Sequence, residues 1–444
     1  MAGAGAGVTR AGRGAKRRRG AARLVAALGA AAFLVPGAHA QATVWVGAGT
    51  GLRIAEQALS GFNYGNSMRV VGWEERFAAL GVTSLRFPPG NVADEQPLND
   101  AAVAALGVNW ELLGRPEVTF VANLFTGSPG ETAASARLLT AAGIDVTLWE
   151  IGNEPDLYAA NRLDPSWTPE RYCAAFREHG AALREVMPGA RLAGPGVSGA
   201  RPGGMVYLAE VLRLCGDVID VLTFHVYPTD GTWSDAAALA TADLVTGELE
   251  RVAAWLADRD ANPLGYERHI EVGVTEFGLS WRTNNFHHLE DMTAALWLAD
   301  TLGRMATGGV AIGHYFALQA MGGHGLIDSS GWVRPTYHVY ALLAGFRGEV
   351  LETAVAGAPG LTAYAATEDG GMSVLVVNLS GDAITVALEL PAGAPNEFEA
   401  RMLNDTTFDR FDGPSAGAYA AGTELAVPAM TIVILRSASP KSEE

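Results

Sequence analysis

The sequence predicts an α/β protein in which a (β/α)₈ TIM barrel occupies residues 59–345 and an antiparallel β-sandwich follows over residues 346–438. Two observations support this prediction. Eight short runs of β-branched and apolar residues alternate with longer runs of helical periodicity, which is typical of βα units around a parallel sheet. Beyond residue 345, strand-like segments follow one another with only turn residues (Gly, Pro, Asn and Asp) between them.

Each predicted barrel strand is a short, mostly apolar run with polar residues at or near its end. The runs are GFNYG (61–65), TSLRF (83–87), VTFVAN (118–123), DVTLWE (145–150), RLAGPG (191–196), DVLTFHVY (220–227), IEVGVTE (270–276) and VAIGHYFAL (310–318). Helix candidates between them, such as PERYCAAFREHGAALREVM and MTAALWLADTLGRMA, repeat apolar residues at three- and four-residue spacing. A doubly wound open sheet is the alternative, but no glycine-rich fingerprint opens the first unit.

The predicted β-sandwich consists of alternating segments that include LTAYAATE, MSVLVVNLS, AITVALELP, FEARMLN and TIVILRS. Another strand-like run, ATVWVG (42–47), comes before the barrel. We therefore expect residues 41–58 to contribute a strand to the sheet of the C-terminal domain.

Residues 1–40 have the order of a secretory signal peptide: a basic stretch, a short apolar run and then AHA, with cleavage predicted after Ala40. The apolar run is too short to remain as a membrane-spanning helix. We therefore expect a secreted or periplasmic protein with no membrane span after signal removal. The export route is open, and a disordered basic arm is the alternative for this segment.

Charge and cysteine content limit the partners of the protein. The chain has a formal net charge of −17, and residues 1–40 carry seven basic and no acidic residues, so the mature chain would have −17 − 7 = −24. Nucleic acid is not an expected partner, because a basic footprint is missing. Cys173 and Cys215 are too few for a thiolate metal site or a disulfide scaffold. The sequence does not show whether the two cysteines form a disulfide. It also leaves the oligomeric state open.

Two glutamates follow strands at the end of the barrel where reactive groups are expected. Glu154 in GNEP comes after the fourth predicted strand, and Glu276 in VTEFG ends the seventh. Paired carboxyl groups suit glycosidic cleavage, because one can protonate the leaving oxygen while the other attacks or supports an oxocarbenium-like carbon. The pair predicts a carbohydrate substrate.

The motifs around these glutamates resemble those of clan A glycoside hydrolases: WEIGNEP, then HVY, then VTEFG. Within the clan, LRFPPGN, ANLFTGSPGETA, WEIGNEPDLY and GLIDSSGWVRPTYHVYALL are most similar to families 79 and 51. These are the heparanase and β-glucuronidase family and the arabinofuranosidase family. The resemblance covers roughly residues 60–345 and implies a retaining, two-glutamate glycosidase acting on a plant- or matrix-type saccharide or glycoside.

The resemblance also implies a role for each matching residue. Glu154 is the acid/base and Glu276 the nucleophile, while Asn153 matches the position that hydrogen-bonds the 2-hydroxyl of the sugar. Arg86 and Tyr227 match groups that hold the nucleophile ionised, since a guanidinium and a phenol hydrogen bond both lower the pKa of a carboxyl group.

Further candidates for substrate binding lie at or just after strand ends: Asn63, His225, Trp281 and Gln319. Purely structural roles are the alternative, namely an ion pair for Arg86 and core packing for His225, Tyr227 and Trp281. Glu150 still lies within its strand, and we expect it to be structural and hydrogen-bonded, because a buried carboxylate needs partners.

No cofactor or metal is expected. FHHLED (286–291) places two histidines beside acids, but adjacent histidines lack the i, i+4 spacing of helical metal ligands. RFPPGN has two prolines where relatives usually show a double glycine, and no basic cluster is evident for a uronate, so glucuronide specificity is not favoured. The alternative to an enzyme is a catalytically silent glycan-binding protein on the same barrel.

Overall fold

The computed structural model describes residues 40–199, 202–406 and 414–438. The predicted signal peptide lies outside these residues, apart from its last position, Ala40. Within the described part of the chain, every helix is either too short or too polar to cross a lipid bilayer.

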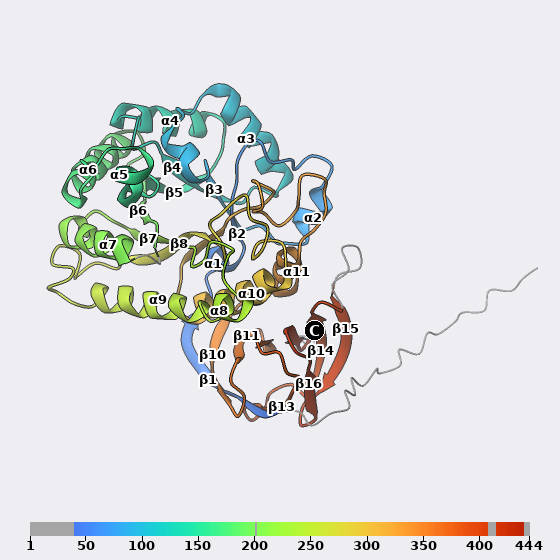
Figure 1. Cartoon of the computed structure of the whole chain (residues 1–444). Coiled ribbons are helices and arrows are strands. Elements are labelled where there is room, and N and C mark those ends of the chain that lie inside the picture. The colour runs from blue at the N-terminus through green and yellow to red at the C-terminus, as the bar shows by residue number, and fades with distance from the viewer. Residues whose placement is uncertain (1–39, 200–201, 407–413, 439–444) are drawn as a thin grey trace, which may run out of the picture. The chain divides into compact units, whose positions relative to one another are not determined.

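Eight parallel strands close into a barrel, which confirms the predicted TIM fold (Figure 1). Each of the eight predicted runs forms one strand. In order around the barrel they are β2 (Gly61–Asn63), β3 (Ser84–Phe87), β4 (Glu117–Ala122), β5 (Val146–Ile151), β6 (Leu192–Val197), β7 (Val221–Val226), β8 (Glu271–Phe277) and β9 (Ile312–Tyr315).

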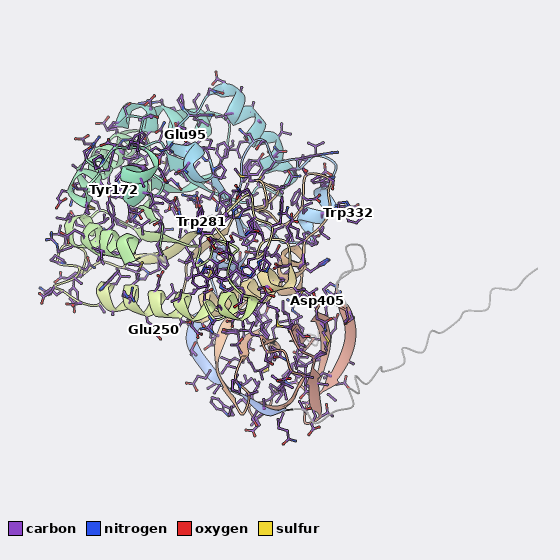
Figure 2. The ribbon with its side chains drawn as sticks, in the orientation of Figure 1. Glu95, Tyr172, Glu250, Trp281, Trp332 and Asp405 are labelled. Carbon is purple, nitrogen blue, oxygen red and sulfur yellow. A yellow bond between two sulfur atoms is a disulfide. The ribbon has the colours of Figure 1, made fainter. Side chains whose placement is uncertain are left out.

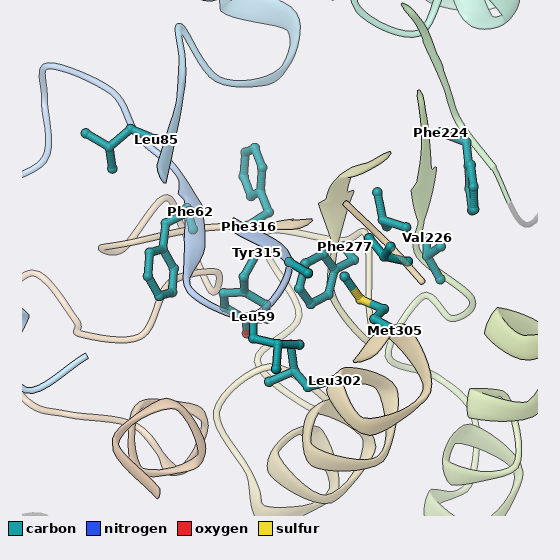
Figure 3. Close-up of a cluster of buried hydrophobic side chains, with 14 of the residues drawn as sticks. Leu59, Phe62, Leu85, Phe224, Val226, Phe277, Leu302, Met305, Tyr315 and Phe316 are labelled. Atoms are coloured by element: carbon teal, nitrogen blue, oxygen red, sulfur yellow. The ribbon is translucent and has the colours of Figure 1, made fainter. Parts of the chain in front are cut away.

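One helix precedes the first barrel strand, and the other helices follow barrel strands along the chain. The helices are α1 (Glu56–Leu59), α2 (Glu74–Ala78), α3 (Asp100–Leu112), α4 (Pro129–Ala141), α5 (Tyr158–Asn161), α6 (Pro169–Val186), α7 (Pro202–Cys215), α8 (Asp235–Leu239), α9 (Ala242–Leu256), α10 (Met292–Thr307) and α11 (Pro335–Leu343). Their apolar faces join the outward side chains of the strands in one large core. Figure 3 shows part of this core, where Phe277 and Tyr315 of the barrel lie near Leu302 and Met305 of α10.

Strand β7 shows how the barrel carries a site at one end. Its alternate residues Leu222, Phe224 and Val226 belong to the core beneath the helices. The others face the barrel interior: Val221 packs in a small apolar layer with residues of β5, β6 and β9, and His225 contacts Glu154 and Glu276. The residues of β7 that face the barrel interior are therefore apolar at the amino end of the strand and polar near its carboxyl end.

The C-terminal domain is built on a nine-stranded sheet of order β15-β14-β17-β12-β11-β10-β1-β13-β16. Its strands are β1 (Ala40–Arg53), β10 (Glu349–Ala356), β11 (Leu361–Glu368), β12 (Gly371–Asn378), β13 (Ile384–Glu389), β14 (Glu397–Leu403), β15 (Ser415–Ala420), β16 (Glu424–Val427) and β17 (Thr431–Arg436). The pairing is antiparallel as predicted, except that β1 runs parallel to β13.

Strand β17 is buried on both of its faces. Val433 and Leu435 lie in the domain's own core, whereas Ile432 and Ile434 belong to the core that also contains the barrel helices. Both faces of the strand are buried, so its sequence is a continuous apolar run rather than an alternating one.

The two cysteines form a disulfide, which answers the question that the sequence left open. Cys173 on α6 and Cys215 on α7 are bonded, with their Cα atoms 5.8 Å apart and 42 positions between them in the sequence. The bond joins two neighbouring helices on the outside of the barrel.

Candidate active site

The loop after β5 turns sharply and holds Glu154 in an uncommon backbone conformation. Gly152 has φ +85°, and a side chain there would meet Leu124 at 2.6 Å, so the turn requires glycine. Glu154 itself has φ +50°, and its N–H donates to the carbonyl of Gly196 at 3.0 Å. A non-glycine residue in this region costs about 1–3 kcal/mol, and such residues cluster at functional sites.

Glu276, near the end of β8, accepts hydrogen bonds on both carboxyl oxygens. Arg86 Nη1 donates to Oε1 at 2.5 Å, and the Tyr227 hydroxyl donates to Oε2 at 3.0 Å. The predicted contacts of Arg86 and Tyr227 with this carboxylate are therefore present. A buried guanidinium and a phenol both stabilise an anionic carboxylate.

Arg86 is fully buried and connects four side chains. Its Nε donates to Glu150 Oε2 at 2.6 Å, and its Nη2 donates to the side-chain oxygen of Asn153 at 2.8 Å. Its Nη1, besides bonding Glu276, donates to the side-chain oxygen of Asn63 at 3.0 Å. The guanidinium fork thus fixes the nucleophile candidate and Asn153 relative to each other.

Glu150 is buried within the barrel, where it serves as the counter-ion of Arg86. Thr275 Oγ1 donates to its other oxygen at 2.7 Å. Burial alone would raise the pKa of Glu150, but the charge of Arg86 outweighs it and the pKa is lowered. The expectation of a structural, hydrogen-bonded Glu150 agrees with this geometry.

His225 lies between the two glutamates and is fully buried. Its Nδ1 is 3.0 Å from Glu154 Oε1 and 3.8 Å from Glu276 Oε2. Burial lowers the pKa of His225, so the ring is neutral near pH 7. Acceptor atoms of all three residues lie within 4.8 Å of one another, which brings an oxygen of Glu154 and one of Glu276 within that distance.

A cavity of about 430 Å³ opens over this pair. Of the predicted residues, the ones that line it are Asn153, Glu154, Tyr227, Glu276 and Trp281. Trp281, labelled in Figure 2, is 44% exposed, and the guanidinium of Arg282 lies 5.0 Å from the centre of its ring. An exposed aromatic face at a cavity rim can stack on a sugar ring.

Asn63 and Gln319, which the sequence predicts to bind substrate, are not among the residues that line the cavity. Asn63 is completely buried, and its Nδ2 donates to the carbonyls of Thr275 and His314, so it supports Arg86 from below. Gln319 is also buried, and its side-chain oxygen accepts from the backbone N–H of Arg69. Arg86 and His225 are likewise absent from the cavity wall, but Arg86 contacts Glu276 and His225 contacts Glu154.

Sequence reasoning missed Asp94, which holds the loop before Glu154 in place. Its buried carboxylate accepts from the backbone N–H of Asn153 at 3.2 Å, from that of Leu124 at 3.0 Å and from the Tyr158 hydroxyl at 2.5 Å. Asp94 lies in a 3₁₀ turn, Gly90–Asp94, three positions beyond the LRFPPGN motif, so the motif did not mark it. Phe316 and His324 also line the cavity, and the sequence analysis did not name them as site residues.

Two groups of the described residues could hold a metal ion by their geometry. One is the set Glu154, His225 and Glu276, which the hydrogen bonds above already explain. The other consists of Asp235, at the start of α8, and of His287 and His288 in the loop between β8 and α10.

Solved structures of several glycosidases share this fold of a (β/α)₈ barrel with an appended β domain. The structure is similar to an α-L-arabinofuranosidase from Thermotoga maritima, with a TM-score of 0.74 and 17% identity over 89% of this chain and 100% of that one. It is also similar to AbfB, a family 51 α-L-arabinofuranosidase from Bifidobacterium longum, with a TM-score of 0.72 and 17% identity over 90% of this chain and 100% of that one.

A family 44 xyloglucanase from Paenibacillus polymyxa is also similar, with a TM-score of 0.65 and 12% identity over 90% of this chain and 100% of that one. The sequence itself matches no protein-family model and no curated protein. At these identities the likeness shows the fold, and it confirms the resemblance to family 51 at that level.

Proposed function

We propose that the protein is a retaining glycoside hydrolase with Glu276 as nucleophile and Glu154 as acid/base. The observation that carries this proposal is that one carboxyl oxygen of Glu154 and one of Glu276 lie within 4.8 Å of each other in the wall of one cavity. Retaining glycosidases hold their carboxyl groups about 5–5.5 Å apart, whereas inverting ones leave about 6.5–9.5 Å for a water molecule.

The surroundings of the two glutamates support different roles for them. Glu276 is bonded to the cation Arg86 and to Tyr227, which favours the anionic nucleophile. Glu154 contacts the neutral His225 and is the more exposed, with 16% of its side chain accessible against 6% for Glu276. The two chemically identical side chains thus lie in different environments, which suits a division of roles between an ionised nucleophile and a protonated acid.

The reaction then follows from these positions. Glu276 attacks the anomeric carbon while Glu154 protonates the leaving oxygen, and a covalent glycosyl-enzyme forms. Glu154, now ionised, takes a proton from water, and that water displaces Glu276 from the sugar. Asn153, held by Arg86 through its side-chain oxygen, has its Nδ2 group to donate to the 2-hydroxyl.

A neutral sugar suits the cavity better than a uronide. The residues that line it include two glutamates but no lysine or arginine among those described. A carboxylate-bearing sugar would face like charges with no cation to offset them. The α-L-arabinofuranosidases of similar fold make an α-L-arabinofuranoside the first substrate to test.

Export to an oxidising compartment is part of this proposal. The signal-like N-terminus motivates it, and the Cys173–Cys215 bond supports it, because structural disulfides persist mainly outside the cytosol.

The function is tested with 4-nitrophenyl glycosides of α-L-arabinofuranose, β-D-xylose, β-D-glucose and β-D-glucuronic acid. We expect hydrolysis of at least one neutral glycoside, little of the glucuronide, and loss of turnover in Glu276→Ala. A glucuronide cleaved fastest would refute the substrate argument. Binding of saccharides without cleavage of any substrate would favour the silent glycan-binding alternative.

A further inference from the structure

We infer that Asp235, His287 and His288 form a binding site for a divalent transition-metal ion of the zinc type, separate from the catalytic pair. Asp235 is the first residue of α8, and the histidines lie in the loop between β8 and α10. One ligand atom from each of the three residues lies within 4.8 Å of the others.

Both histidines direct the same ring atom at the same carboxylate oxygen. His287 Nε2 is 3.0 Å and His288 Nε2 is 3.1 Å from Asp235 Oδ1. The two rings lie face to face, with centroids 3.9 Å apart and planes inclined by 32°. Zinc bonds of about 2.0–2.2 Å in a tetrahedral arrangement separate ligand atoms by about 3.3–3.5 Å. A widening of a few tenths of an ångström therefore suffices for an ion to enter.

The hydrogen bond on the other side of His287 is a second, independent observation. Its Nδ1 lies 2.9 Å from the carbonyl oxygen of Gly231, so Nδ1 carries the proton and donates it. Nε2 is then the ring atom that faces Asp235 Oδ1, 3.0 Å away. Only a cation, either a proton on Nε2 or a metal ion, makes this contact favourable.

The same hydrogen bond is the one that metal-ligating histidines usually make. A backbone carbonyl that accepts from the far ring nitrogen fixes the tautomer and aims the ligand nitrogen at the ion. Gly231 has φ +76°, a backbone conformation that favours glycine, and its carbonyl faces the ring of His287 in this conformation.

The ligand types select the class of ion. Two imidazole nitrogens and one carboxylate oxygen suit zinc or a similar transition metal, whereas calcium and magnesium prefer oxygen ligands throughout. Asp291 Oδ2, 3.9 Å from His287 Nε2, is the nearest further oxygen for a fourth position. It also accepts from the backbone N–H of His288 at 2.7 Å, which fixes its orientation.

An ion at this site would fasten two loops at the mouth of the barrel. Asp235 and Gly231 belong to the segment after β7, and the histidines belong to the segment after β8 that also carries Trp281 and Thr283 of the cavity wall. The ion would therefore stabilise the wall of the cavity without contacting the reacting atoms.

The sequence could not show this site, because Asp235 and His287 are 52 positions apart. The adjacent histidines by themselves gave no reason to expect a metal. The third ligand and the carbonyl of Gly231 come together only through the fold.

The test is zinc titration of the tag-free full chain, stripped with EDTA and dialysed, by isothermal titration calorimetry. We expect one zinc ion per chain, and affinity lowered about 100-fold or more in Asp235→Ala and in His287→Ala. Both side chains are about half exposed, so these variants should fold, which circular dichroism will check. His269→Ala, a change of an exposed histidine outside the cluster, is the matched control and should bind as the unmodified chain does.

Cobalt(II) gives a second readout that does not depend on catalysis. The visible absorption of a low-symmetry Co²⁺ site should appear with the unmodified chain and be lost in Asp235→Ala. Absence of zinc binding, or binding that both variants retain, would overturn the inference. Either result leaves the proposed glycosidase activity untouched, because neither assay measures turnover.

Discussion

Replacing Arg86 by methionine tests two roles of its guanidinium: stabilising the fold as the buried counter-ion of Glu150, and supporting turnover through its contact with Glu276. The side chain of Arg86 is fully buried, as is that of Glu150, and only 6% of the Glu276 side chain is exposed. Removing one partner of a buried ion pair costs about 3–5 kcal/mol, because the other charge is left uncompensated. We expect Arg86→Met to lose about that much unfolding free energy, mostly through Glu150, since Glu276 can be solvated from the cavity.

A second change distinguishes stability from catalysis. Glu150→Gln in the Arg86→Met background removes the stranded charge and should restore at least half of the lost stability, as measured by urea unfolding followed through tryptophan fluorescence. Turnover should stay reduced by about 10²–10³-fold, the usual loss when a preorganised charge partner is removed, because Glu276 still lacks its cation. Full stability in Arg86→Met, or recovery of activity in the double variant, would refute this reasoning.

Three further outcomes are expected. Replacing Cys173 and Cys215 by alanine should lower the unfolding free energy by about 2–4 kcal/mol and leave kcat/KM unchanged, because the bond joins outer helices; a large fall in kcat/KM would contradict this. Asp94→Ala should reduce kcat at least tenfold, because buried N–H groups that position Glu154 lose their acceptor; unchanged kcat in a folded variant would show that Asp94 is dispensable. Burial lowers the pKa of five histidines, among them His225; the pKa falls to about 4 for His179, His324 and His338 and to about 3 for His314. Below pH 6.5 the unfolded chain therefore binds more protons than the folded one, so stability should be complete above pH 6.5 and fall as the pH drops toward 4; urea unfolding at pH 7, 6 and 5 that shows no decline would contradict this.

The barrel could be predicted because its physical signal is local. Each strand is buried on both sides, so its sequence is a short apolar run, and the helices between them carry one apolar face. The parallel pairing of β1 with β13 could not be predicted, since it joins segments more than 300 positions apart that carry no pairing signal.

The same distinction applies to the site. Strand ends marked Glu154, Glu276, Arg86 and Tyr227, because parallel strands bring their carboxyl ends together. A strand end does not reveal how deep a side chain lies, and this is why Asn63 was placed at the substrate rather than beneath Arg86. Asp94 escaped notice because its role depends on backbone N–H groups, which are the same in every residue.

The most direct test of the account is to find which carboxylate forms the covalent intermediate. The chain would be incubated with the 2-deoxy-2-fluoro derivative, carrying a good leaving group, of the sugar that it cleaves fastest, and then digested and mapped by mass spectrometry. The fluorine slows both steps and the leaving group restores the first, so the glycosyl-enzyme accumulates. We predict the label on Glu276 and its absence in Glu276→Ala. A label on Glu154 or Glu150 would contradict the assignment, and so would turnover that proceeds with inversion and leaves no label.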